Sequence, residues 1–215
     1  IWSELWLKIN MDFQGGFTGK IGNVVLVQRG DTYYMRSVPA KTVNPRSPKQ
    51  QANRRIFGLS SSLAAKLAPF LRISMQPVPD KSPRGAFISL NKNTSIVYGE
   101  HGPVILYPKL ILSAGTLPPP TRLSAVREHP GVLRLNWEAG DAPSHTARQR
   151  DTLLFLLLVP DTHERFFVIH GPERHETTYA LPIPESLQAS PLHVYALTRS
   201  ANGKKVSDTV YAGVG

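Results

Sequence analysis

The chain has 215 residues and a mass of 23.8 kDa, with 41% hydrophobic and 19% charged residues. This length suits one large domain or two small ones, and the apolar fraction is sufficient for a packed core, which excludes a disordered chain of low hydrophobicity and high charge. No apolar run approaches the roughly 18 residues of a membrane span, and without cysteine there are no disulfides, Cys-ligated metal sites or thiol nucleophiles.

The net positive charge lies entirely in the first half of the chain. Residues 1–116 contain 15 Lys/Arg and 5 Asp/Glu, a net of +10, whereas residues 117–215 contain 10 of each. No acidic residue occurs between Asp31 and Asp80. Such a window predicts an anionic partner: nucleic acid, a phospholipid surface or an acidic protein surface. A solvated basic face is the more common explanation of a charge run. The candidate anion-binding residues are Arg36, Lys41, Arg46, Lys49, Arg54 and Arg55.

The first ten residues are apolar and contain two tryptophans. They lack the basic leader and the small-residue cleavage site of a secretory signal peptide, so the localisation stays open between extracellular filament, virion and other contexts. Their apolar spacing fits one face of a helix or one face of a strand. We expect either a terminus docked on the core of its own chain or an arm that inserts into a neighbouring subunit. The candidate assembly residues are Ile1, Trp2, Leu5, Trp6, Leu7 and Ile9.

The first half of the chain predicts a β-hairpin followed by helices. The glycine-rich stretch 14–20 lacks the spacing of a phosphate-binding P-loop and is interpreted as a turn. Stretches 24–28 and 32–37 read as strands joined by a tight turn at Arg-Gly-Asp. A helix is expected to begin after Ser47 as N-cap, with Pro48 at N1, and to end or kink at Pro69.

Further along the first half, Ser82-Pro83 predicts a second helix opening of the same kind. Stretches 104–107 and 110–112 are apolar and read as strands. The triple proline at 118–120 follows, close to the point where net charge stops accumulating. We place a domain boundary there.

The second half predicts an all-β sandwich. Seven short strand-like stretches follow at regular spacing, at 122–127, 132–138, 152–159, 165–169, 177–180, 192–198 and 206–212. The stretch 133–137, which ends in Trp137, resembles the second strand of fibronectin type III domains with its core Trp. His193 to Ala196 resembles the strand with that family's core Tyr, and Leu181-Pro182 resembles the bend before it. The resemblance covers roughly residues 118–213 and implies a spacer or interaction module without assigning an activity.

The chain as a whole resembles an uncharacterised family of roughly 200-residue proteins associated with Bacteroidota. The matching motifs are GGFTGKIGN from Gly15, RSVP from Arg36, NPRSPKQQANR from Asn44, and the closing VSDTVY from Val206. The match begins at about Met11, so residues 1–10 are expected to be an extension upstream of the family's usual start. The resemblance implies a shared ancestry and no catalytic activity.

No catalytic residue, metal site or cofactor is predicted. His163, His170 and His175 lie within 14 residues, but no pair has the H-E-x-x-H spacing, and we interpret them as surface histidines. No Gly-x-Ser-x-Gly elbow is present for a Ser/His/Asp triad. Nucleic-acid binding is suggested by charge alone, with Tyr33, Tyr34 and Phe57 able to stack on bases, although core packing is the more common role of such residues.

These observations lead to a mainly β fold with a helical segment. We expect an N-terminal arm at residues 1–10, a basic α+β domain at 11–117 and a fibronectin III-like β-sandwich at 118–215. The leading hypothesis is a non-enzymatic structural subunit that self-assembles into a homo-oligomer, as in a filament, a virion-like particle or a surface array. The alternative is a sequence-independent nucleic-acid-binding protein that uses the basic face of residues 32–79. The expected partners are the chain itself and nucleic acid or an acidic protein surface, and no cofactor is expected.

Overall fold

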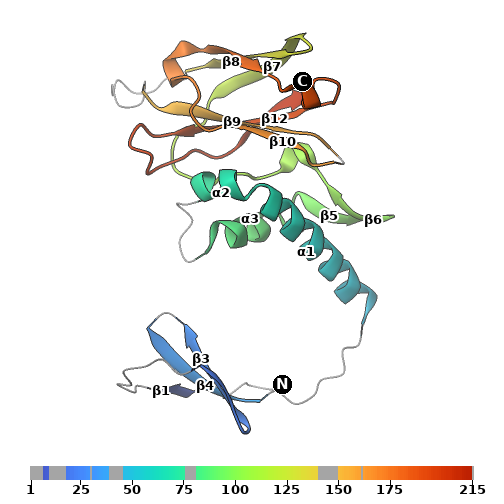
Figure 1. Ribbon diagram of the computed structural model, residues 1–215, viewed down its shortest axis with the longest axis vertical. Helices are drawn as coiled ribbons and strands as arrows, with labels where there is room; N and C mark the ends of the chain where they lie inside the picture. The colour runs from blue at the N-terminus through green and yellow to red at the C-terminus, as the bar shows by residue number, and fades with distance from the viewer. Residues whose placement is uncertain are drawn as a thin grey trace. The chain divides into compact units, whose positions relative to one another are not determined.

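Figure 1 shows the computed structural model of the chain. The structure describes residues 7–9, 18–29, 31–38, 46–75, 81–139, 150–160 and 162–214. The chain divides into two compact units, Ile1–Arg46 and Ser47–Gly215, hereafter the first and the second unit. The predicted fold class is confirmed, because antiparallel strands predominate and the helices are confined to one segment.

The first unit is a small antiparallel sheet. It contains β1 (Leu7–Ile9), β2 (Gly19–Ile21), β3 (Val24–Arg29) and β4 (Thr32–Ser37) in the order β1-β4-β3-β2. The hairpin of β3 and β4 is confirmed, with Arg29 opposite Thr32 next to the turn. Gly22, in the turn between β2 and β3, has a φ of +57°, a value that favours glycine because it has no Cβ. The turn follows the glycine-rich stretch 14–20, of which residues 19 and 20 already belong to β2 and residues 14–17 lie outside the described residues.

Three helices open the second unit: α1 (Pro48–Lys66), α2 (Ala68–Ser74) and α3 (Pro83–Asn91). Both predicted N-caps are present, since the Ser47 hydroxyl accepts from the backbone N–H of Gln50 and the Ser82 hydroxyl from that of Gly85. Within the described residues no single helix is long and apolar enough to span a membrane. Together α1 and α2 reach that length and composition, and they are bent by 85° relative to each other.

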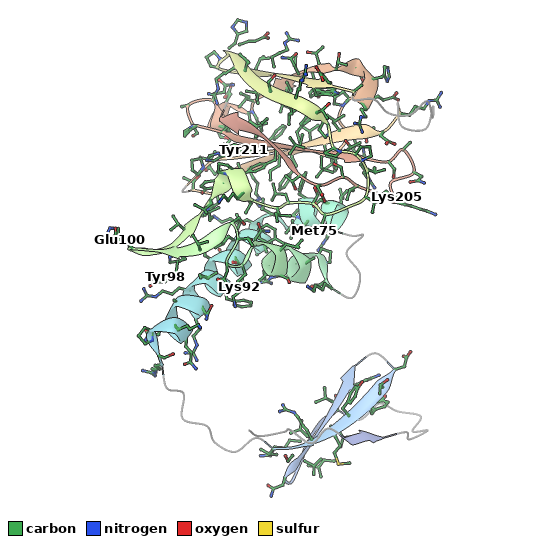
Figure 2. All side chains as sticks on the ribbon, turned by 180° about the vertical axis from the view of Figure 1, so that it is seen from behind. Met75, Lys92, Tyr98, Glu100, Lys205 and Tyr211 are labelled. Atoms are coloured by element: carbon green, nitrogen blue, oxygen red, sulfur yellow. The ribbon has the colours of Figure 1, made fainter. Side chains whose placement is uncertain are left out.

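A short hairpin of β5 (Ile96–Gly99) and β6 (Gly102–Ile105) follows α3 and contacts α1. The Arg55 guanidinium on α1 donates a hydrogen bond of 3.0 Å to the Tyr98 hydroxyl on β5. Figure 2 shows Tyr98 beside α1 and Glu100 at the outer end of the hairpin. A 3-10 turn, η1 (Tyr107–Lys109), then leads toward the sandwich.

The rest of the second unit is a sandwich of two antiparallel sheets. One sheet has the order β11-β8-β7, formed by β7 (Thr121–His129), β8 (Val132–Glu138) and β11 (Thr178–Pro182). The other has the order β10-β9-β12-β13, formed by β9 (Thr152–Leu158), β10 (Arg165–Val168), β12 (His193–Arg199) and β13 (Val210–Val214). Each predicted stretch overlaps one of these strands, although β13 begins at Val210 and residues 206–209 of the last stretch precede it. Two 3-10 turns, η2 (Arg174–Glu176) and η3 (Glu185–Leu187), lie between the strands.

The four-stranded sheet is buried on both faces, which makes the second unit three layers thick (Figure 1). Leu153, Phe155 and Leu157 of β9 pack into the core between the two sheets. Their neighbours Leu154, Leu156 and Leu158 pack instead into a second core with the helices. Because successive side chains of a strand point to opposite faces, an unbroken apolar run is what a central strand with two covered faces requires.

Truncating either side of β9 tests this arrangement. Leu156→Ala and Leu157→Ala should each lower the free energy of unfolding by about 3 kcal/mol, because each leaves a cavity in a different fully buried core. Denaturant unfolding measures both losses, with Ile169→Ala, at a side chain 37% exposed, as the control. A loss below about 1 kcal/mol for Leu156→Ala would show that the helices do not cover this face.

The prediction of a strand at 110–112 is wrong. This segment has no strand partner, although Leu110 and Leu112 are buried. Side chains take the place of a neighbouring strand: the Asn91 amide bonds both the N–H and the C=O of Ile111, and the Thr209 hydroxyl accepts from the N–H of Leu112. Buried backbone groups need partners, and these contacts supply them without a ladder.

The units divide between Arg46 and Ser47, so the predicted boundary at residues 117/118 falls inside the second unit. The helices and the sandwich share a core there, and Leu117 donates to the backbone oxygen of Val206. The three-part division of the chain stays a prediction.

Candidate functional site

The sheet of the first unit has two chemically different faces. Directly paired residues share a face, and residues along a strand alternate between faces. Val24 pairs with Ile21 and Ser37, and Leu26 pairs with Met35, so these positions share one face. Val25 pairs with Lys20 and Arg36, which places these positions on the opposite face.

The first of these is the apolar face. Its described apolar side chains are Ile21, Val24, Leu26, Tyr33 and Met35. None of them is buried: four are half-buried, and Ile21 is 55% exposed. A β-sheet needs its apolar face packed against another layer for stability, so this face requires a cover.

The second is the basic face, defined by Lys20, Val25, Val27, Tyr34 and Arg36. Lys20 is exposed, and the others are half-buried. Two further basic residues occupy register positions on this face, because Lys8 pairs with Tyr34 and Arg29 pairs with Thr32. The four strands contain no acidic residue, so all of their charge is positive and belongs to one face.

The candidate assembly residues fall partly in this sheet. Leu7 and Ile9 belong to β1, where they pair with Met35 and Tyr33 of the same chain, at register positions of the apolar face. Of the two conformations considered for this segment, residues 7–9 adopt the strand. The remaining assembly residues, Ile1, Trp2, Leu5 and Trp6, lie outside the described residues.

The candidate anion-binding residues are distributed over both units. Arg36 lies on β4, Arg46 ends the first unit with a φ of +47°, and Lys41 lies outside the described residues. Lys49, Arg54 and Arg55 belong to α1 of the second unit and are exposed. The structure therefore groups three of them on one helix and one of them on the basic face, and the window 32–79 spans two units.

Sequence reasoning missed Lys20. Side chains alternate between the two faces along β3 and β4, and the same rule applies to β2. Because Val25 pairs with both Lys20 and Arg36, this rule places Lys20 on the basic face. What the sequence did not supply was this register, because the turn at Gly22 had to be recognised as the connection between two strands.

A groove of about 330 Å³ lies in the second unit, where the segment after η1 meets β13. Leu90, Lys109, Asp208 and Tyr211 are among the residues that line it. Its polar groups hold the backbone in place: the Asp208 carboxylate accepts from the N–H of Gly115, and the Thr209 hydroxyl accepts from the N–H of Leu112 and that of Ser113. These contacts assign the groove a structural role.

Beside this groove, His193 is enclosed by aromatic rings. Its imidazole stacks on Tyr107 with ring centroids 4.2 Å apart, and its Nδ1 lies 2.8 Å from the Tyr211 hydroxyl. Burial lowers the pKa of His193 and raises that of Tyr211, because each charged form loses hydration. Burial likewise raises the pKa of Tyr195, whose hydroxyl donates to the backbone oxygen of Tyr107. At neutral pH this cluster favours uncharged, hydrogen-bonded side chains.

The predicted surface histidines lie outside the strands: His163 precedes β10, His170 follows it, and His175 belongs to η2. His170 and His175 are exposed and His163 is half-buried, and the His175 imidazole lies 3.3 Å from the Glu173 carboxylate. Across the part of the chain that the structure describes, no three His, Cys, Asp or Glu side chains gather in an arrangement that could hold a metal ion.

These features define a mainly β protein with a two-faced sheet and a β-sandwich covered by helices. The chain belongs to a family of unknown function, DUF6266, whose model matches residues 16–213. The predicted membership of an uncharacterised family is thereby confirmed. No curated protein matches the chain, and no solved structure matches it.

Proposed function

We propose that the chain is a non-enzymatic structural subunit that self-assembles into a homo-oligomer, of the kind that builds filaments, virion-like particles or surface arrays. The observation that carries this proposal is the apolar face of the first unit. Four half-buried apolar side chains and the exposed Ile21 form a layer that gains stability only when another apolar surface packs on it.

The occupant proposed for this face is the same face of a second copy. The strand residues on it carry no charge, so two copies meeting there bring no like charges together, although the chain has a net charge of +10. The basic residues of the sheet occupy register positions on the opposite face. A self-complementary contact of this type forms a closed, two-fold symmetric pair.

The assembly arm enters the proposal through β1. Its pairing with β4 runs within one chain, at an edge of the sheet. The same pairing made by β1 of a neighbouring copy would preserve every backbone hydrogen bond, which is the basis of domain swapping. Arm exchange would thus link copies by strand pairing at an edge of the sheet. The apolar face would link them by packing of one sheet on another.

The C-terminal sandwich is proposed to be of the fibronectin type III kind. In support, its first, second and fifth strands form one sheet, and its third, fourth, sixth and seventh strands form the other. Trp137, the next-to-last residue of β8, lies in the core between these sheets, as the resemblance implies. Tyr195 is also buried, but it packs into the core with the helices. The helices therefore cover the outer face of the sheet that contains β12. A spacer or interaction module suits a structural subunit.

The mass in solution of two neighbouring variants tests the proposal. Leu26→Asn removes an apolar side chain from the apolar face, and Val27→Asn makes the matched change on the basic face. In a symmetric pair both copies lose the Leu26 side chain, and each loss removes about 2 kcal/mol of burial free energy. The association is therefore weakened roughly a thousandfold. Light scattering should give a multiple of 23.8 kDa for the wild type and for Val27→Asn, and about one chain for Leu26→Asn.

Either of two results contradicts the proposal. One is a wild-type mass of a single chain at every concentration up to the solubility limit. The other is an equal loss of assembly in both variants, which indicates a general loss of folding. A chain that starts at Met11 serves as a further comparison, because it lacks β1 but retains the apolar residues of β2, β3 and β4. If the chain that starts at Met11 dissociates while Leu26→Asn and Val27→Asn stay assembled, arm exchange is the contact that holds the copies together.

A further inference from the structure

The exposed apolar side chains of the second unit gather on α1 and the β5–β6 hairpin. In the part of the chain that the structure describes, seven large apolar side chains are exposed, and four of them belong to these elements or follow β6 directly: Phe57, Tyr98, Val104 and Leu106. Phe57 is 53% exposed and Val104 is 47% exposed. Single apolar residues on a surface are ordinary, whereas a concentration of them marks an interaction surface.

The hairpin has an inner face toward α1 and an outer face away from it. Tyr98 belongs to the inner face, because its hydroxyl accepts a hydrogen bond from Arg55 of α1. Val97 and Val104 pair with each other and lie on the outer face, since side chains alternate along a strand. The next pair on that face consists of two glycines and adds no side chains. The outer face is therefore flat and apolar.

Phe57 lies on the side of α1 that is turned away from the hairpin. Two residues correspond to about 200° around an α-helix, so Phe57 points away from the side on which Arg55 meets Tyr98. Arg54 precedes Phe57 by three residues and is its neighbour on the helix surface. Both side chains are exposed, and no ion pair among the described residues includes Arg54. Arg54 and Phe57 are called the α1 flank below.

The hairpin and the α1 flank carry opposite charges. Glu100, at the outer end of the hairpin (Figure 2), is the one acidic residue in the described ranges 46–75 and 81–116. Its side chain is exposed and is in no ion pair among the described residues. No acidic residue belongs to α1 itself. A second copy can therefore place its Glu100 beside Arg54 while the outer face of its hairpin covers Phe57.

We propose that the outer face of the hairpin of one copy docks on the α1 flank of the next copy. The two surfaces lie on opposite sides of α1 and its hairpin, so a two-fold axis cannot bring both together at one contact. The contact is heterologous, and it repeats from copy to copy in a filament or a ring.

This inference rests on the self-assembly proposed above and adds the contact by which an assembly grows beyond a pair. Each hairpin contact is small. It therefore joins the pairs formed through the apolar face, which present two copies of each surface, and not single chains.

Charge reversal tests the contact, with light scattering at rising protein concentration as the readout. Glu100→Arg and Arg54→Glu each bring like charges together, so each alone should raise the concentration at which species larger than two chains appear at least tenfold. An equal mixture of the two variants should assemble as the wild type does, because each hairpin then meets an opposite charge on the other variant. Glu185→Arg, at an exposed residue of η3, is the matched control and should change nothing.

The apolar part of the contact is tested separately. Phe57→Ala and Val104→Asn should each raise the same concentration at least tenfold, because both side chains become buried when the hairpin docks. Val126→Asn makes the matched change at an exposed valine of β7 and should have no effect.

The outcomes separate this contact from the one in the first unit. A wild type that stops at two chains overturns the inference and leaves the first-unit pair intact. So does a mixture of Glu100→Arg and Arg54→Glu that fails to recover assembly, or an effect of Glu185→Arg or Val126→Asn equal to that of the contact variants. A wild type of one chain at every concentration contradicts the proposed function, and the hairpin contact falls with it.

Discussion

Replacing Asn91 by leucine is expected to lower the free energy of unfolding of the second unit by about 3 kcal/mol or more. The Asn91 side chain is fully buried at the end of α3. Its Nδ2 donates to the backbone oxygens of Phe87 and Ile111, and its Oδ1 accepts from the N–H of Ile111 at 2.8 Å. Leucine has nearly the same volume but leaves both backbone groups of Ile111 without these partners, at roughly 1–3 kcal/mol for each buried group.

The measurement for Asn91→Leu is urea unfolding followed by the signal of the buried Trp137. Asn91→Asp provides a matched comparison, because the carboxylate can accept from Ile111 but cannot donate to the two carbonyls. Burial raises the pKa of that carboxyl, so Asn91→Asp should lose stability as the pH rises through this raised pKa and regain it in acid. An Asn91→Leu chain within about 1 kcal/mol of the wild type would contradict the role given to this side chain.

Replacing Arg174 by methionine is expected to lower the free energy of unfolding by about 3 kcal/mol or more, because it leaves three backbone oxygens without their donors, at roughly 1–3 kcal/mol for each buried group. Arg174 is 2% exposed, in η2. Its Nε donates to the backbone oxygen of Ala139 at 2.6 Å, after the end of β8. Its Nη1 and Nη2 donate to the backbone oxygens of Pro118 and Pro119, before the start of β7, at 2.8 and 3.1 Å. One guanidinium thus joins both ends of the first hairpin of the sandwich.

Arg122 is the matched control for Arg174. It also lies at the start of β7 and pairs with Glu138, but its side chain is 80% exposed. Arg122→Met should change the stability by less than about 1 kcal/mol, because exposed ion pairs contribute little. Thermal unfolding of Arg174→Met, Arg174→Lys and Arg122→Met compares the three. The lysine variant should also be unstable, since one ammonium group cannot reproduce the guanidinium fork. Equal stability of Arg174→Met and Arg122→Met would show that the Arg174 guanidinium does not stabilise the first hairpin of the sandwich.

The sandwich could be predicted from local pattern because its strands are short, apolar and regularly spaced. The bounds expected for β8, residues 132–138, are those found, and alternation on this strand places Leu133, Leu135 and Trp137 in one core. The helix starts at Ser47 and Ser82 were equally local, since a capping serine acts within one turn.

The helical layer over β9 was beyond the reach of local pattern. The unbroken apolar run at residues 153–159 indicates that both faces of this strand are covered. It does not indicate which elements cover them. The segment at 110–112 shows the same limit: its apolar residues predicted a strand, whereas its backbone partners are the side chains of Asn91 and Thr209, distant in sequence. Such contacts depend on tertiary packing, which no window of neighbouring residues contains.

The candidate site was predicted in part. Charge composition pointed to the first half of the chain, and of the predicted anion-binding residues Arg36 lies on the basic face. The exposed cations of α1 belong to the other unit, because a charge run in sequence need not be a patch in space. The separation of an apolar from a basic face emerges only when the register of three strands is combined.

Thiol labelling tests the central claim, that a second copy covers the apolar face, most directly. The chain contains no cysteine, so Leu26→Cys and Val27→Cys each introduce a single reactive thiol, on the apolar and the basic face respectively. As the protein concentration rises from nanomolar to micromolar, the rate of reaction of Leu26→Cys with a charged maleimide should fall at least tenfold, because assembly buries it. The rate for Val27→Cys should stay constant. A rate for Leu26→Cys that does not depend on concentration, or an equal fall for both thiols, would contradict the account.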